Sequence, residues 1–177
     1  TGFGGLVLTA KEDELDLWKS YCQKYGREKD LIIIGQGSKE CFNFLDYESS
    51  RPDKGTGITH NIADTLKTVI KAGAKNSQES DKAFWDASLQ QLLVNAVDLC
   101  LLTQKKIRVE HIYKIIQSAP KSKTELSNEN WRKSSACFRS MEHAAIALSR
   151  KRPSPEIDNK ARRLQIIEDF FYGNWLY

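Results

Sequence analysis

The sequence lacks both glycine-rich patterns that hold nucleotide phosphates. Neither G-x-x-x-x-G-K-[ST] nor G-x-G-x-x-G occurs in its 177 residues, although an apolar run at Leu6 to Leu8 leads into helix-forming residues, as in nucleotide-binding α/β units. Gly2, Gly4 and Gly5 precede that run, so they cannot offer backbone N–H groups at the start of the next helix. No magnesium-binding acid directly follows either predicted strand, since Thr9 follows Leu6 to Leu8 and Gly35 follows Leu31 to Ile34. We therefore expect no ATP or magnesium site in this chain, and no catalysis by it.

Long apolar runs are missing too. Runs such as Leu31 to Ile34 and Leu99 to Leu102 are four residues long, whereas a membrane helix needs about 20. Only four residues are proline and 28% are charged, as in an ordinary globular chain. The sequence begins at Thr1 with no initiator methionine and no visible signal peptide. We expect a soluble, cytoplasmic fragment of a longer protein, with no membrane contact of its own.

Cysteine is scarce and scattered. The sequence has no C-x-x-C pair, and no histidine stands at ligand spacing from a cysteine. The pattern excludes the usual zinc signatures and gives no catalytic cysteine a local partner. It predicts buried, reduced, structural thiols at the four positions Cys22, Cys41, Cys100 and Cys137.

The first part of the chain alternates strand and helix signals. Leu6 to Leu8 and Leu31 to Ile34 are typical of buried strands. Between them, Thr9-Ala-Lys-Glu12 has the form of a capping box that begins a helix, and Gly26 is placed to end it. This order predicts a strand-helix-strand piece within residues 1–48, and paired carboxylates there, such as Asp46 and Glu48, are interpreted as solvated charges.

The remainder has helical periodicity. The apolar spacing predicts helices over 58–73, 81–103, 109–116, 131–148 and 155–171. The helix at 81–103 has the longest apolar stripe and is expected at the centre of the core, with Trp85 and Trp131 as core anchors. The expected fold class is therefore mainly α: a helical bundle over 58–175 behind a small N-terminal α/β piece.

Positive charge concentrates in the second half. Residues 101–177 carry 15 basic and 8 acidic side chains, whereas residues 1–100 carry 12 and 15. Basic clusters at helix ends and connectors can bind phosphates without sequence preference, or acidic proteins, but ordinary solubilising charge gives the same count. The candidate partner-binding residues are Lys105, Lys106, Arg108, Lys121, Lys123, Arg132, Lys133, Arg150, Lys151, Arg152, Arg162 and Arg163.

Several segments resemble a known family. "GGLVLTAKEDELDLWKSYCQKYGREKDLIII", "FNFLDYE", "DKAFWDASLQQLLVNAVDLCLLT" and "IYKIIQSAP" are similar to the middle of the coupling-protein ATPases of conjugative and type IV secretion systems, the TraG/TraD-like branch. The resemblance covers about 4–48 and 59–120, with Asn43-Phe-Leu-Asp46 and Phe84-Trp85 as its more specific motifs. Where family members often have Asp-Pro-Lys-Gly after the first strand, this chain has Thr9-Ala-Lys11-Glu12.

This resemblance implies a function in substrate recognition. Residues 1–48 would be part of a RecA-like domain, and 58–175 the all-α domain that receives relaxase-bound DNA or a secreted protein. It implies a hexameric, membrane-anchored parent chain with its own ATP and magnesium site. Two alternatives stay open: a protein-docking adaptor that does not bind DNA, and a small nucleotide-binding enzyme.

Overall fold

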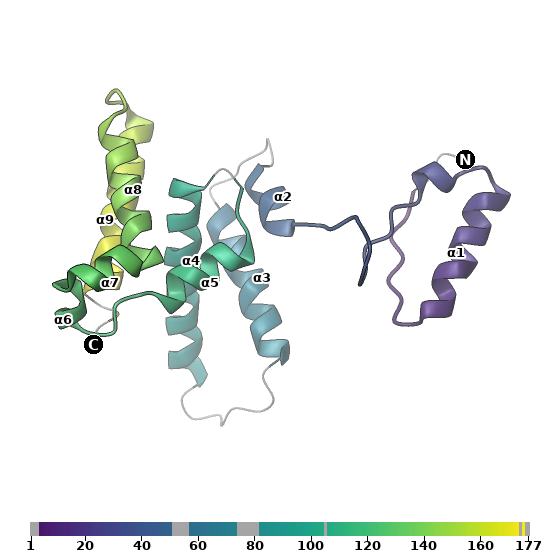
Figure 1. Ribbon diagram of the computed structural model, residues 1–177, viewed down its shortest axis with the longest axis horizontal. Coiled ribbons are helices and arrows are strands. Elements are labelled where there is room, and N and C mark those ends of the chain that lie inside the picture. The colour runs from purple at the N-terminus through teal and green to yellow at the C-terminus, as the bar shows by residue number, and fades with distance from the viewer. Residues whose placement is uncertain (1–3, 51–56, 74–81, 105, 174, 176–177) are drawn as a thin grey trace. The chain divides into compact units, whose positions relative to one another are not determined.

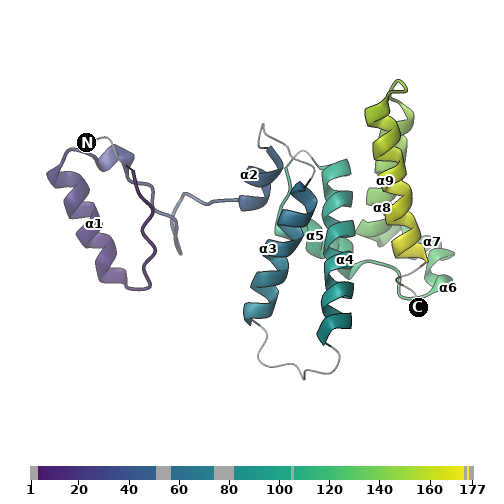
Figure 2. The same cartoon turned by 180° about the vertical axis from the view of Figure 1, so that it is seen from behind.

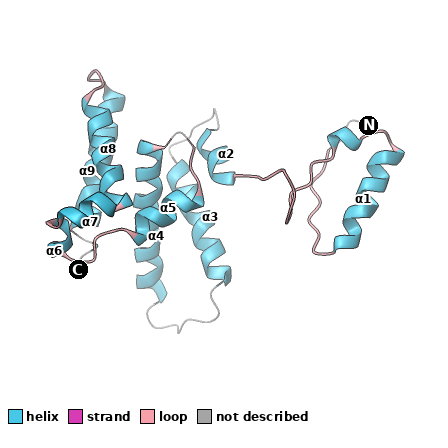
Figure 3. Ribbon diagram, in the orientation of Figure 1, coloured by secondary structure: helices cyan, strands magenta, loops and turns pink. Residues whose placement is uncertain are grey.

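The computed structural model describes residues 4–50, 57–73, 82–104, 106–173 and 175. It divides into two compact units, Thr1–Phe42 and Asn43–Tyr177, which are considered separately. Figure 3 shows helices joined by loops, with no strand in the described part of the chain. The predicted mainly α fold class is confirmed.

The N-terminal unit holds helix α1 (Glu12–Lys24) and the short 3-10 helix η1 (Glu28–Asp30). The end of α1 is as predicted: Gly26 has φ 66°, and the N–H of Arg27 donates to the carbonyl of Cys22 at 2.7 Å, which closes a Schellman motif. The beginning is not. The helix starts three residues after Thr9 with no side-chain cap. The Thr9 hydroxyl instead accepts from the N–H of Lys11 at 3.1 Å, and the side chain of Glu12 lies outside the described residues.

The two strands predicted in this unit are wrong. Leu6 to Leu8 has no regular structure, and Leu31 to Ile34 contributes only one isolated parallel bridge, from Ile34 to Glu40. Apolar runs become strands only when neighbouring strands take up their backbone hydrogen bonds. Among the described residues of this unit, none provides such a ladder. The expected strand-helix-strand piece is therefore α1 and the short η1 between segments without regular structure.

The second unit is a bundle of helices (Figure 1). Its helices are α2 (Phe44–Ser50), α3 (Ile58–Gly73), α4 (Lys82–Thr103), α5 (Val109–Gln117), α6 (Lys123–Leu126), α7 (Glu129–Ser134), α8 (Ala136–Ser149) and α9 (Pro155–Tyr172). The helix α2 belongs to this unit because Leu45 is fully buried in its core. The unit therefore begins at residue 43, not between 48 and 58 as the sequence suggested.

Helix α4 is the centre of this bundle, as predicted. It packs against α3, α5, α8 and α9, and α5 lies across it in both views (Figure 2). Its middle turns are enclosed: Ala96, Val97, Leu99 and Cys100 are all fully buried. The other helices close one continuous core around these turns, with Ile167 and Phe171 contributed by α9.

Two further predictions are wrong, one about the burial of Trp85 and one about a continuous helix over 131–148. Trp85 is 65% exposed, because it lies in the first turn of α4 and the core gathers around later turns. The expected helix 131–148 is divided into α7 and α8 at Ser135, whose backbone is extended (φ −68°, ψ 119°) and whose hydroxyl accepts from the N–H of Phe138. Trp131 is half-buried, edge-on to Phe138 at 5.9 Å between ring centroids.

Among the helices described, none combines the length and apolar character needed to cross a bilayer.

Candidate functional site

The turn between α8 and α9 carries three consecutive exposed cations. Arg150, Lys151 and Arg152 follow the end of α8 and are all exposed, and Figure 1 shows this turn extending beyond the end of α4. None of the three forms a salt bridge within the described ranges. We call these three residues the basic tip.

The local sequence explains the shape of this turn. Arg150 continues the helical backbone of α8 (φ −84°, ψ −9°), where positive charge is favoured at a helix C-terminus. Helix α9 then begins with the Ser154 hydroxyl accepting from the N–H of Ile157, and with Pro155 at its first position, as predicted. The nearest acid, Glu156, is held by Lys160 at 2.5 Å. This hydrogen bond lowers the pKa of Glu156, with a smaller contribution from Lys151.

Arg163 has a structural partner. Its guanidinium forms an ion pair with Asp98, and the Asp98 carboxylate also accepts from the hydroxyl of Thr59 at 2.5 Å. Asp98 is buried in α4, so the cluster joins α3, α4 and α9. Desolvation lowers the pKa of Arg163. Its neighbour Arg162 is exposed, with no ion pair in the described part of the chain, so only Arg162 of this pair offers an available charge.

The basic residues of α6 and α7 are partly engaged. Arg132 donates from Nε to the carbonyl of Leu126 at 2.6 Å and lies 5.2 Å from the ring centroid of Phe138. Lys133 pairs with Glu129 at 3.7 Å. Lys121 precedes α6 and Lys123 is its first residue, and both side chains are exposed. The backbone N–H of Lys121 donates to Glu125. These cations stabilise the corner before α8 and lie away from the basic tip (Figure 1).

The loop before α5 holds the remaining predicted cations. Lys106 lies 4.0 Å from Asp46, and Arg108 is exposed at the N-cap of α5; Lys105 lies outside the described residues. Asn43 fixes this loop, because its amide donates to the carbonyl of Ile107 at 2.7 Å while its side-chain oxygen accepts from the N–H of Asp46. The Asn43-to-Asp46 motif therefore joins α2 to the loop.

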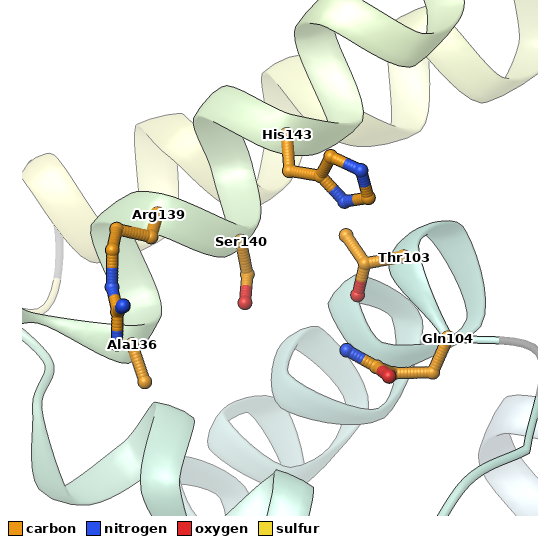
Figure 4. A pocket seen from close by; sticks show the side chains of 6 residues that line it. All are labelled: Thr103, Gln104, Ala136, Arg139, Ser140 and His143. Atoms are coloured by element: carbon orange, nitrogen blue, oxygen red, sulfur yellow. The ribbon is translucent and has the colours of Figure 1, made fainter.

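A shallow pocket between the end of α4 and the outer face of α8 was missed by sequence reasoning (Figure 4). Its polar lining comes from two helices separated by some 35 residues, so no local motif could mark it. Figure 4 shows Ser140 and His143 of α8 across from Thr103, the last residue of α4, and Gln104, which follows it. The lining residues are Thr103, Gln104, Ala136, Arg139, Ser140 and His143.

The four cysteines differ in exposure. Cys100 and Cys137 are buried, and desolvation raises the pKa of each thiol to about 12, which makes both inert. The prediction of buried thiols is confirmed for these two. It is wrong for Cys22, which is half-buried, and for Cys41, which is exposed. Within the described ranges, no three metal-ligating side chains gather at one place.

An exposed apolar patch marks the other end of the α3–α4 pair. Phe84 and Trp85 at the start of α4 are edge-on to each other, 5.6 Å between centroids, and both are largely exposed. Val69 and Ile70, near the end of α3, are exposed as well. Exposed aromatic pairs such as Phe84 and Trp85 are typical of surfaces that bind proteins.

Comparisons of the chain with protein-family models, with curated proteins and with solved structures found no match.

Proposed function

We propose that the helical unit, residues 43–177, is the substrate-recognition domain of a type IV secretion or conjugation coupling ATPase and binds nucleic acid at the basic tip. Two observations support this. The order of segments through residue 120 resembles that family, and three exposed cations with no ion pair to a described residue lie together at one turn. The proposed role of the chain is binding, with ATP hydrolysis left to the parent protein.

The proposal extends to the cellular setting. The parent chain would be hexameric, anchored to the inner membrane, and would hold ATP and magnesium outside the present residues. This domain would then work on the cytoplasmic side, where a relaxase-bound DNA strand or a secreted protein reaches it.

The observation that carries the proposal is the unpaired state of Arg150, Lys151 and Arg152 in the described structure. A cation already held in an ion pair must give up its partner to bind a phosphate, whereas these three need not. Each phosphate neutralised releases condensed counterions, so the logarithm of affinity falls with the logarithm of salt by about 0.7 per contact for single-stranded DNA and about 0.9 for duplex. Three contacts predict a slope near −2 to −3.

The test is a salt titration of oligonucleotide binding by fluorescence anisotropy. The full chain should bind single-stranded and duplex DNA at low salt with the slope given above. R150Q/K151Q/R152Q should flatten the slope by about 2 or more. A charge-matched control, K106Q/K114Q/K133Q, removes three cations that each lie beside an acid, and it should change the slope far less. No binding at low salt, or equal losses in both triple variants, would contradict the proposal.

A protein-docking function is the second candidate, and the exposed Phe84 and Trp85 favour it. An adaptor of this kind would hold its partner through these rings, with the basic tip contacting acidic side chains. F84A/W85A should then abolish capture of a relaxosome or secreted protein, while DNA retention stays unchanged. Under the DNA-binding proposal, the basic-tip variant is the one that loses retention.

A further inference from the structure

We infer that the α4–α8 pocket is a phosphate subsite continuous with the basic tip, so that one face of α8 follows a nucleic-acid backbone. This inference rests on the proposed function. It adds to the proposed interface several residues that do not belong to the predicted basic clusters. Arg139, Ser140 and His143 come from α8, and Gln104 comes from the end of α4.

The pocket is lined by unused hydrogen-bonding groups. The side chains of Gln104, Ser140 and His143 make no hydrogen bond to any other described residue. Arg139 donates only from Nε, to the carbonyl of Ser135 at 3.4 Å, which leaves the rest of its guanidinium available. No carboxylate lines the pocket. Arginine, serine and glutamine are the side chains that contact phosphate oxygens in protein–DNA interfaces.

Helix geometry connects this pocket to the basic tip. At 3.6 residues per turn, positions four and eleven residues after Arg139 lie on nearly the same face of α8. These positions are His143 and Arg150, and the backbone of Arg150 is still helical. The opposite face holds the buried Cys137, Met141 and Ala144. The exposed face therefore presents a line from Arg139 to Arg150, about 16 Å long at 1.5 Å per residue.

One acidic side chain of α8, the exposed Glu142, lies beside this line, about 60° around the helix from Arg139. Its charge is one of several lesser causes that raise the pKa of Tyr172 in α9. The line joins the cationic and neutral donors over about three turns and passes the exposed side chain of Ile146. A strand with phosphates at regular spacing can contact Arg139 and the basic tip together, which favours a nucleic-acid backbone over a compact anion.

The experiment compares three variants of the full chain in the same salt titration. R139Q should weaken binding of a single-stranded oligothymidylate by about tenfold, as expected for one charge-assisted hydrogen bond, and lower the salt slope by about 0.7. Q104A/S140A should weaken binding severalfold with the slope unchanged, because it removes donors and no charge. K19Q removes an exposed cation of the N-terminal unit and should change neither.

The ligand class is checked with polyglutamate of matched charge, and thermal unfolding of each variant confirms that it folds. Loss of oligothymidylate affinity in R139Q and Q104A/S140A, with little effect on polyglutamate, supports the phosphate subsite. Wild-type affinity in both variants overturns the subsite, and the proposed function still stands if the basic-tip variant loses binding. Equal losses for polyglutamate overturn the phosphate assignment. No oligonucleotide binding by the wild-type chain overturns the proposed function itself.

Discussion

The two units contrast in what they bury. In the N-terminal unit, no side chain described between residues 4 and 42 is buried, and large apolar groups such as Leu6, Leu8 and Ile32 are 85%, 85% and 71% exposed. In the helical unit, Leu45, Ile62, Leu99 and Phe171 are fully buried in one continuous core. Both units have periodic apolar residues, but only in the helical unit do other helices pack against those residues.

The contrast teaches that apolar periodicity predicts which face of a helix is apolar. It does not predict whether another element packs against that face and buries it. A segment of about 40 residues buries too little surface to be stable without disulfides, metals or association. The free energy of folding of this chain should therefore come almost wholly from residues 43–177. Local features, such as the Schellman motif after α1, form in both units because they need only neighbouring residues.

The largest expected effect comes from matched leucine substitutions in the two units. Leu99→Ala should lower the free energy of unfolding by about 2–5 kcal/mol, because it leaves a cavity in the centre of the bundle. Leu17→Ala in α1, where the side chain is 47% exposed, should change it by no more than about 0.5 kcal/mol. Urea denaturation followed by circular dichroism measures both, and comparable losses would remove the contrast.

A smaller effect is expected from two adjacent arginines of α9. Arg163→Ala should cost roughly 1–3 kcal/mol, because it leaves the buried Asp98 carboxylate without its cation; the partial exposure of Arg163 keeps this below the cost for a fully buried pair. Arg162→Ala should stay within about 0.5 kcal/mol. Thermal unfolding of the two variants gives the comparison, and an Arg163→Ala protein as stable as the wild type would refute the structural role of this ion pair.

The smallest effect concerns the helix starts. Ser154→Ala removes the side-chain cap of α9 and should cost about 1 kcal/mol. Thr9→Ala should have almost no effect on global unfolding, because the Thr9 hydroxyl does not cap α1 and its unit contributes no core. Chemical denaturation of both single variants provides the measurement. A larger loss for Thr9→Ala than for Ser154→Ala would mean that the N-terminal unit unfolds together with the bundle.

Sequence reasoning predicted the elements that depend on local chemistry. The ends of α3 and α5 follow directly from Gly73 and the Ser118-to-Pro120 segment. The start of α9 follows from the Ser154-Pro155 pair. It could not foresee which apolar residues find partners. Trp85 lies on an apolar stripe, yet its turn of α4 extends beyond the core, and Leu31 to Ile34 has strand composition without a neighbouring strand.

The candidate site shows the same division. The basic tip is a local cluster, and its charges can be counted in the sequence. Pairing between helices cannot be read from the sequence in this way. Arg163 contacts Asp98 of α4, which is some 65 residues away in the chain, and Gln104 lies near the α8 residues only after the bundle folds. The Ser135 break between α7 and α8 also depends on a distant group, since the Ser135 hydroxyl donates to the carbonyl of Ser118 at 2.8 Å.

The most direct measurement is amide hydrogen exchange by mass spectrometry, with and without a saturating single-stranded oligonucleotide at low salt. The account predicts added protection in peptides that cover the outer face of α8 and the turn at 149–154, with unchanged exchange in residues 4–42. Protection centred on the start of α4 around Phe84 and Trp85, or no protection anywhere in the helical unit, would contradict it.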